Sequence, residues 1–357
     1  MLIDISSDNV TQPTAEMRAA MQQAQGRGYG VPYDRFTEEL EAIAASLCGK
    51  EAALIMPTGT QANLVAILSH TEPAQEVILG PDSHIYEQEL GGAAAIAGVM
   101  IKTWASAGIP STQILSDAIQ PDYRFPTKAS PQPALVCLEN SHNASGGTVI
   151  SAQEMHDLAQ IIHEAGLKLH VDGARIFNAA ASLQIDPAEL CEPVDSLIFS
   201  LDKCLSAPFG AMLLGSKQMI TQARHYRRML GGYTRKIGIF AAAGIIALKE
   251  MRQQVVEDNQ RAASLSKRLH QLNGITINPY PISTNLVMID LSSLKFDPQA
   301  FTKRLQREYQ VIAHIYGKHI VRLAIHRHIG KEEEEHIASA IENCLKMMIE
   351  DESCRAR

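Results

Sequence analysis

Short apolar runs alternate with stretches of helical periodicity through the first two-thirds of the chain. Helical segments lie between several of these runs. In the segment 151–167, for example, Ser151 can cap a helix, Glu154 follows three residues later, and apolar residues recur at helical spacing. Apolar strands that alternate with helices indicate an α/β fold with a mainly parallel sheet covered on both faces. The runs predict buried strands at 52–59, 75–81, 134–140, 167–174, 196–200 and 211–216.

The pattern changes from about Gly238, where a long helical stretch runs to about Leu272. The residues beyond it predict two strands, a helix between them and a charged amphipathic helix from Lys331. A chain of 357 residues exceeds the usual size of a single core. We therefore predict a large α/β domain at 16–244 and a smaller α+β domain formed by 1–15 and 245–357.

Composition excludes several classes of protein. The net charge of −7 leaves no basic surface of the kind that binds nucleic acid. The apolar run 238–248 is too short to span a bilayer, and the N-terminus lacks the basic and apolar regions of a signal peptide. The 6 cysteines are scattered without a C-x-x-C pair, which favours free thiols in a reducing compartment. We predict a soluble cytoplasmic protein that binds neither nucleic acid nor membrane.

Ligands of open α/β sheets gather at the carboxyl ends of the strands, so the residues that follow each predicted strand are candidates. After the first strand, Thr58, Gly59 and Thr60 open a helix, whose free N–H groups can hold a phosphate. An ordinary capping turn is the alternative. The turn is not a G-x-x-x-x-G-K-[ST] loop, and the glycine-rich 26–30 does not follow a strand. Both facts argue against a nucleoside triphosphatase and against a Rossmann dinucleotide site.

Two histidines also follow predicted strands. His84 comes after the second strand, where its flat ring can stack on an aromatic cofactor or simply belong to a turn. His142 comes after the third strand, and a histidine there can act as an acid or base near neutral pH. The alternative for His142 is a turn closed by Gly146 and Gly147.

Two charged residues complete the set. Asp172 ends a buried apolar strand, and such a carboxylate is costly unless it meets a cation. Lys203 follows the next strand. If only the residues around it are considered, a solvated loop is the simpler explanation for a lysine at this position. Pyridoxal phosphate, however, needs a lysine amine for a Schiff base and a carboxylate to keep its pyridine nitrogen protonated. Together with the phosphate turn at 58–60 and His84, these residues predict a pyridoxal phosphate site.

Longer segments carry a resemblance that runs over nearly the whole chain. They are SSDNVTQPT (6–14), GKEAALIMPTGTQANLVAILSH (49–70), SHIYEQELGGAAAIAG (83–98), LENSHNASGGTVIS (138–151), LHVDGARIFNAA (169–180), SLDKCLSAPFGAMLLGS (200–216), RRMLGGYTRKIGIFAAAGIIAL (227–248) and VRLAIH (321–326). In these segments the chain resembles the L-threonine aldolase and β-eliminating lyase family of fold-type I pyridoxal phosphate enzymes.

The resemblance implies roles for individual residues. Lys203 would carry the cofactor, Asp172 would face its pyridine nitrogen, and His84 would stack on its ring. His142 would lie near the substrate β-hydroxyl. Arg235 would reach a cofactor phosphate, often across a dimer interface, so the resemblance implies a homodimer or homotetramer with shared active sites.

The same resemblance implies a set of residues around the substrate. Ser7, Arg175 and Arg322 would bind its carboxylate, with bidentate hydrogen bonds from the arginines. Arg175 would also lie beside the cofactor, and Tyr29 would lie beside the substrate. The substrate itself would be a small β-hydroxy-α-amino acid such as threonine or allo-threonine, cleaved into glycine and an aldehyde.

The chain departs from the family's pattern around the substrate entrance. Ser6 stands where an arginine is usual, and the segment 26–39 lacks an acidic pair. Asp202 and Cys204 flank Lys203 where serine and glycine are usual. Asp202 would either hold the lysine protonated or point away as a solvated turn residue. These departures bear on specificity more than on reaction class.

Three rival interpretations remain. A β-eliminating lyase that acts on an aromatic or sulfur-bearing amino acid would use the same cofactor residues and differ in its products, pyruvate and ammonia. A non-catalytic pyridoxal phosphate-binding scaffold is less favoured, because the candidate catalytic residues are intact. A metal site at His326 and His328 lacks an evident third ligand, so we predict no metal.

Overall fold

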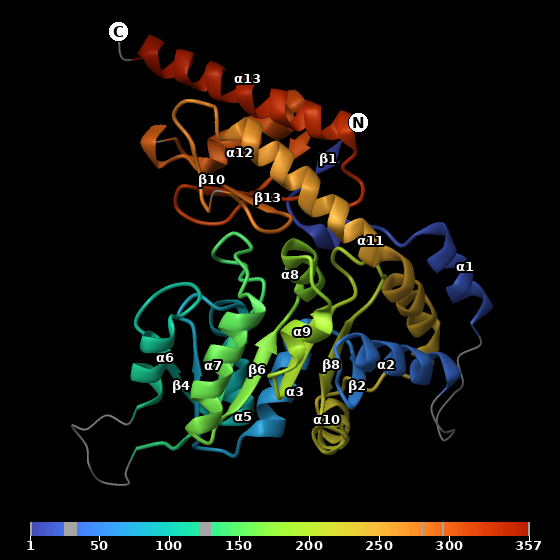
Figure 1. The fold of residues 1–357 in the computed structure, drawn as a ribbon. Helices are drawn as coiled ribbons and strands as arrows, with labels where there is room; N and C mark the ends of the chain where they lie inside the picture. The colour runs from blue at the N-terminus through green and yellow to red at the C-terminus, as the bar shows by residue number, and fades with distance from the viewer. Residues whose placement is uncertain (1, 25–33, 121–129, 280, 295, 356–357) are drawn as a thin grey trace.

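The computed structural model describes residues 2–24, 34–120, 130–279, 281–294 and 296–355 (Figure 1). Its large lobe is built on a 7-stranded sheet. Strand β8 runs antiparallel to both of its neighbours, and the other pairs are parallel. In spatial order the strands are β2 (Ala52–Met56), β8 (Ala211–Gly215), β7 (Ser196–Ser200), β6 (Lys168–Asp172), β5 (Pro133–Glu139), β3 (Glu76–Leu79) and β4 (Met100–Thr103). The predicted α/β fold and its strands are confirmed, and β4 is an edge strand that the apolar pattern missed.

Helices cover both faces of this sheet. They are α1 (Ala15–Gln23), α2 (Arg35–Leu47), α3 (Gly59–His70), α4 (His84–Glu87), α5 (Gly92–Ala97), α6 (Thr112–Ile119), α7 (Ala152–Glu164), α8 (Ile176–Leu183), α9 (Pro187–Cys191) and α10 (Lys217–Met229), with a 3-10 turn η1 at Asp8–Val10. The predicted capping box of α7 is present, because Ser151 and Glu154 bond to each other's backbone.

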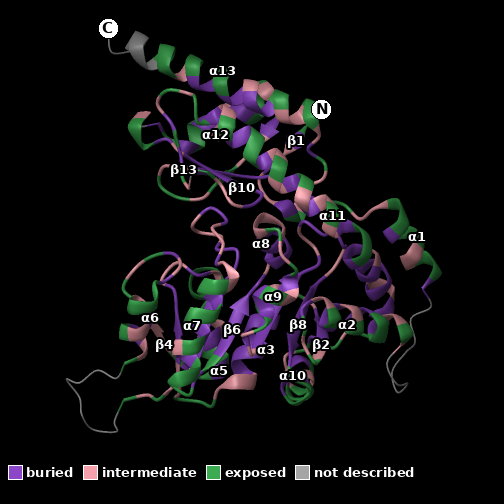
Figure 2. Cartoon of the chain, viewed as in Figure 1, coloured by how far each residue is buried: buried purple, intermediate pink, exposed green. Residues whose placement is uncertain are grey.

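Successive strand residues point to opposite sides of the sheet, and each side has its own core. Phe199 of β7 packs into the cluster that includes residues of α2 and α7, whereas its neighbour Ile198 packs with α3 and α10. Figure 2 shows these strands as a continuous buried layer beneath exposed helix faces. Because both faces are covered, the carboxyl ends of the strands are the part of the sheet left to bind a ligand.

The small lobe has a separate core, formed by residues such as Phe301, Val321 and Ile341. Its strand β1 (Ile3–Asp4) pairs in parallel with β11 (Val311–Ile312). An antiparallel sheet has the order β12 (His314–Ile315), β13 (Ile320–Ala324), β10 (Leu286–Asp290) and β9 (Thr276–Ile277). Helices α12 (Pro298–Tyr309) and α13 (Lys331–Arg355) and the 3-10 turn η2 (Ser292–Leu294) complete the lobe.

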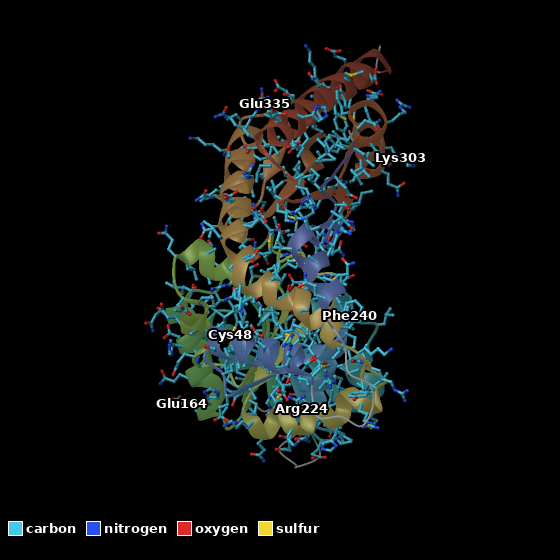
Figure 3. All side chains as sticks on the ribbon, turned by 90° about the vertical axis from the view of Figure 1, so that its right-hand side faces the viewer. Cys48, Glu164, Arg224, Phe240, Lys303 and Glu335 are labelled. Atoms are coloured by element: carbon cyan, nitrogen blue, oxygen red, sulfur yellow. The ribbon has the colours of Figure 1, made fainter. Side chains whose placement is uncertain are left out.

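Helix α11 (Gly238–Leu269) joins the two lobes. It contributes Leu248 to the core of the large lobe and Leu265 to that of the small lobe. Figure 3 shows the helix running from the level of Phe240 toward the lobe that carries Lys303 and Glu335. The predicted domain boundary after residue 244 falls inside this helix and stays a prediction. Over the described part of the chain, no helix combines the length and apolar character needed to cross a membrane.

Candidate active site

A cavity of about 570 Å³ lies at the carboxyl ends of β6 and β7, where the small lobe meets the sheet. Strand and loop residues of the large lobe form one wall, including Asp172 and Lys203. The hairpin of β12 and β13 forms another wall, with Tyr316 and Arg322. The N-terminal segment adds Ser7. The fold therefore gathers residues from three distant parts of the chain around one space.

Most of the predicted site residues meet at this cavity. Its lining includes Ser7, Gly59, Thr60, His84, Asp172, Arg175, Lys203 and Arg322. Thr58 stands just behind the lining, where its side chain caps α3 by accepting a hydrogen bond from the backbone N–H of Gln61. The predicted phosphate turn is thus both a capping turn and the cavity-facing start of a helix, so the two interpretations of its sequence are compatible.

Besides Thr58, two of the described predicted residues are absent from the lining, and a third predicted residue is not described. Tyr29 lies outside the described residues. Arg235 is an exposed residue of the large lobe and is absent from the cavity lining of the single chain. His142 is buried behind the lining, on a small separate cavity that it shares with Trp104 and Glu139.

The turn that holds His142 explains its position. Its Nδ1 accepts a hydrogen bond from the backbone of Ser145 at 3.2 Å, and its Nε2 lies 3.8 Å from a carboxylate oxygen of Asp82. Gly147 has a φ of 78°, and a Cβ at that position would collide with Thr284 of the small lobe. The turn is therefore a packed contact between the lobes, which favours the alternative that its glycines suggested.

Lys203 occupies an electrostatically unusual place. Burial and the nearby charge of Arg175 lower the pKa of its amine. Among the described residues, it forms no ion pair within 4.0 Å. Asp202 also lies on the cavity, where burial raises the pKa of its carboxyl. Because Lys203 lies on the cavity and burial lowers its pKa, the solvated-loop explanation does not hold. An amine that loses its proton more readily is also a better nucleophile.

Asp172 and His84 also line the cavity, and the pKa of each is shifted in the direction that favours its charged form. Burial alone would raise the pKa of Asp172, but the charges of His84 and Lys203 and a hydrogen bond from Asn63 hold that pKa below its usual value. Burial likewise opposes the charged form of His84, yet Glu89, whose carboxylate lies 2.9 Å from Nδ1, raises its pKa. Both side chains thus favour their charged forms.

Arg175 differs from the prediction in one respect. Its guanidinium donates to both carboxylate oxygens of Asp8, at 2.6 and 2.9 Å, and both residues are buried. It also donates to the amide oxygen of Asn143 at 3.2 Å. Arg322 donates to that same oxygen at 3.0 Å, and its Nε has no hydrogen-bond partner among the described residues. Arg322 is therefore the arginine with more capacity left to bind a substrate carboxylate.

Sequence reasoning missed several residues of the site. Asn63, Glu89, Glu139 and Asn143 all line the cavity and bond to predicted residues or their backbone. Glu139 ends a buried strand, and the signal that singled out Asp172 would have found it. Asn63 lies inside an apolar helix and carries no comparable local signal.

The residues present fit pyridoxal phosphate. Ser141 Oγ and Arg322 Nε are buried polar atoms at the cavity with no partner in the described part of the chain, and a bound anion or hydroxyl would supply one. The N-terminus of the 12-residue helix α3 faces the cavity through Gly59 and Thr60 and suits a phosphate. His84, Glu89 and Asp172 each place one potential ligand atom within 4.8 Å of the others, but hydrogen bonds already join these groups.

Comparisons with known proteins agree with this arrangement. The family model described as beta-eliminating lyase matches residues 4–293. Low-specificity L-threonine aldolase 1 of Arabidopsis thaliana is 34% identical over 352 residues, which are 98% of this chain and 98% of that protein. Low specificity L-threonine aldolase of Escherichia coli (strain K12) is 34% identical over 341 residues, or 95% and 98% of the two chains.

Solved structures share the fold. A threonine aldolase structure from Leishmania major superposes with a TM-score of 0.81 at 21% identity and covers 97% of this chain and 99% of that one. An alanine–glyoxylate aminotransferase from Nostoc sp. reaches a TM-score of 0.74 at 16% identity, with coverage of 96% and 95%. At such identities the likeness concerns the fold alone.

Proposed function

The chain belongs to the beta-eliminating lyase family, and from this membership and its cavity we propose that it is a pyridoxal phosphate-dependent aldolase that cleaves threonine-like β-hydroxy-α-amino acids into glycine and an aldehyde. The predicted resemblance, the lyase class and the cofactor are confirmed by this membership. The observation that carries the proposal is Lys203, an amine of lowered pKa on the wall of a cavity that also holds Asp172.

Each part of the cofactor would have a partner. Pyridoxal phosphate, when bound, supplies an electron-accepting ring joined to the substrate's amino nitrogen. Lys203 would hold it through its amine, Asp172 would hold the ring nitrogen protonated, and His84 would lie against the ring. The start of α3 at Gly59 and Thr60 would hold the phosphate with its free N–H groups.

The substrate carboxylate would be bound at the junction of the two lobes. Arg322 has an unpartnered Nε at the cavity, and Ser7 lies beside it on the lining. Arg175 would contribute less charge, because Asp8 already neutralises it. Asn143 accepts from both arginines and would fix their relative orientation. This arrangement would position the α-carbon of the substrate before any bond breaks.

Carbon–carbon cleavage also requires that the β-hydroxyl lose its proton. We place this step at His84, because its Nδ1 donates to Glu89 and leaves Nε2 to accept a proton when the ring is neutral. His142, the base that the sequence suggested, is separated from the cavity lining and stays a prediction to be tested. The two histidines can be distinguished by substitution.

The assembly and the compartment belong to the same proposal. A homodimer or homotetramer would bring Arg235 of one subunit to the phosphate of another. Leu90 is 99% exposed and Tyr86 49% exposed, and both flank the cavity-lining residues 87–89. A second copy of the chain would cover this apolar rim. The described cysteines are free and buried, which supports a cytoplasmic location.

Two experiments test the proposal. Borohydride reduction of the cofactor-loaded protein should attach the cofactor to the peptide that contains Lys203, and label on another lysine would contradict the assignment. Incubation with threonine, allo-threonine and phenylserine should release an aldehyde and glycine. Release of pyruvate and ammonia instead would identify a β-eliminating lyase.

For shared active sites, an Arg235→Ala chain mixed with a Lys203→Ala chain should recover part of the activity in hybrid dimers. The recovery is expected because one of the two sites then contains both native residues. Hybrids of verified composition that stay inactive would show that each subunit builds its site alone.

A further inference from the structure

A chain of hydrogen bonds leads from the cavity into the interior of the large lobe. It begins at Asn63, whose amide nitrogen donates to a carboxylate oxygen of Asp172 and to one of Glu89, both at 2.8 Å. Asn63 is buried, and the other carboxylate oxygen of Asp172 accepts from the backbone of Ala174 at 3.1 Å. Asn63 therefore donates to both acids. In the proposed function, Asp172 faces the cofactor nitrogen and Glu89 pairs with the stacking histidine, His84.

The chain continues behind Asn63. Its amide oxygen lies 3.1 Å from Nε2 of His170, and Nδ1 of His170 lies 2.8 Å from the hydroxyl of Ser196. That hydroxyl lies 2.8 Å from Nε2 of His70, which is half-buried. Four side chains thus connect Asp172 to the far end of α3.

The fold sets these residues side by side. Asn63 and His70 are seven residues apart on α3, which is about two turns, so they share one face of the helix. His170 and Asp172 are two residues apart on β6 and share one face of the sheet. His170 and Ser196 are register partners on neighbouring strands. Helix and strand periodicity therefore explain why the side chains of this hydrogen-bond chain lie next to one another in this order.

The direction of every proton in the chain can be deduced. The two N–H groups of Asn63 are used by carboxylates, so its oxygen must accept, and Nε2 of His170 must carry a proton. Burial and the neighbouring His70 lower the pKa of His170 to about 3, so its ring is neutral and Nδ1 accepts from Ser196. The hydroxyl oxygen of Ser196 then accepts from His70. All donors point toward Asp172.

We propose that Asn63 and His170 are positioning residues that hold Asp172 in its charged form for the ring nitrogen of pyridoxal phosphate. The inference rests on the proposed function. Donors aimed at a carboxylate favour its charged form, and without Asn63 the Oδ2 atom of Asp172 would lose its side-chain donor. A hydrogen bond to a charged group typically changes an equilibrium about ten- to hundredfold.

The test compares two ligands in the full-length, cofactor-free protein. One is pyridoxal phosphate, and the other is its analogue with a C–H group in place of the ring nitrogen. Asn63→Ala should raise the dissociation constant of pyridoxal phosphate about ten- to hundredfold. It should leave binding of the analogue unchanged or stronger, because the analogue gives Asp172 no proton to hold.

The outcomes distinguish a failure of the positioning role from a failure of the proposed function. If Asn63→Ala raises the dissociation constants of both ligands by the same factor, the residue is merely structural and the inference fails. If the unmodified protein does not bind pyridoxal phosphate, the proposed function fails. Ser196→Ala removes the proton donor to His170 and should shift the ratio of the two constants in the same direction, by a smaller factor. Ser266→Ala is the matched control, since Ser266 is a buried serine on α11 whose hydroxyl donates to the backbone carbonyl of Ala263.

A spectroscopic measurement keeps the inference testable if these variants fail to fold. Nitrogen-15 NMR of the histidine-labelled protein should show His170 as a neutral ring protonated at Nε2 and bare at Nδ1 at pH 7. A ring protonated only at Nδ1 would reverse the direction of the chain, and a ring protonated at both nitrogens could not accept from Ser196. Either result would overturn the inference.

Discussion

The pairing of His84 with Glu89 makes a prediction about the pH dependence of the reaction. Glu89 is buried, its carboxylate lies 2.9 Å from Nδ1 of His84, and burial raises its own pKa. Glu89→Gln removes the charge but keeps an oxygen that can accept from both His84 and Asn63. The substitution therefore changes the electrostatics while preserving the hydrogen bonds.

The expected size of the effect follows from the exposure of the histidine. A neighbouring opposite charge shifts a pKa by about 1 to 3 units, and the His84 side chain is 34% exposed, so solvent screens part of the effect. We expect a decrease of about one unit in the pKa of His84. Because the neutral ring is the base, activity rises as pH rises through this pKa. The acid limb of kcat/KM should therefore move about one pH unit lower in the variant.

The assay is kcat/KM for threonine cleavage between pH 5 and 9, scored by aldehyde release. Glu87→Gln is the matched control, because Glu87 is an exposed residue on the same cavity rim. Its acid limb should coincide with that of the unmodified protein. An unmoved limb in Glu89→Gln, or a limb moved to higher pH, would refute His84 as the base whose charge Glu89 sets.

Further predictions concern residues outside the reacting centre. His142→Phe should lower kcat less than about tenfold, because His142 lies behind the cavity lining, and a loss of about 10² to 10⁴ would restore it as the base. Asp8→Ala should lower the free energy of unfolding by about 3–5 kcal/mol at pH 7, measured with urea, because Arg175 is left buried and unpaired. Since the pKa of Asp8 is lowered, this difference should begin to shrink as the pH falls below the usual value of about 4, and it should be lost only at far lower pH. Burial raises the pKa of Asp258 to about 7, so its charge destabilises the folded protein increasingly as pH rises from 4 to 7. Asp258→Asn should therefore raise the melting temperature at pH 8 and leave it unchanged at pH 4.

Strands and their ends could be predicted because burial on both faces leaves a local pattern. The runs at 196–200 and 211–216 became β7 and β8 with nearly the expected bounds. Strand β4 was missed because its residues are half-buried or exposed at the sheet edge, where no continuous apolar run is required. The position of a residue after a strand predicted Asp172 and Lys203 at the cavity, since the chain there has little freedom to turn away.

Side-chain direction after a longer turn could not be predicted in the same way. His142 was singled out by its chemistry, yet the turn buries it and presents its neighbours Ser141 and Asn143 to the cavity. The pairing of Asp8 with Arg175 joins residues 167 positions apart, and neither segment alone indicates it. Such contacts depend on how the two lobes meet, and a periodic pattern carries no information about that.

The distribution of paired and unpaired charges gives the cavity its chemical polarity. Arg175 is neutralised by Asp8, and His84 by Glu89, so neither pair has much net charge to offer a ligand. Among the described residues, Asp172, Lys203 and Arg322 line the cavity without an ion pair within 4.0 Å, as do the acids Glu87, Glu139 and Asp202. Buried charges without a partner are costly and are retained where a ligand supplies the missing charge. Of these residues, Asp172, Lys203 and Arg322 would meet the pyridine nitrogen, the aldehyde carbon and the substrate carboxylate, and the paired residues would hold them in place.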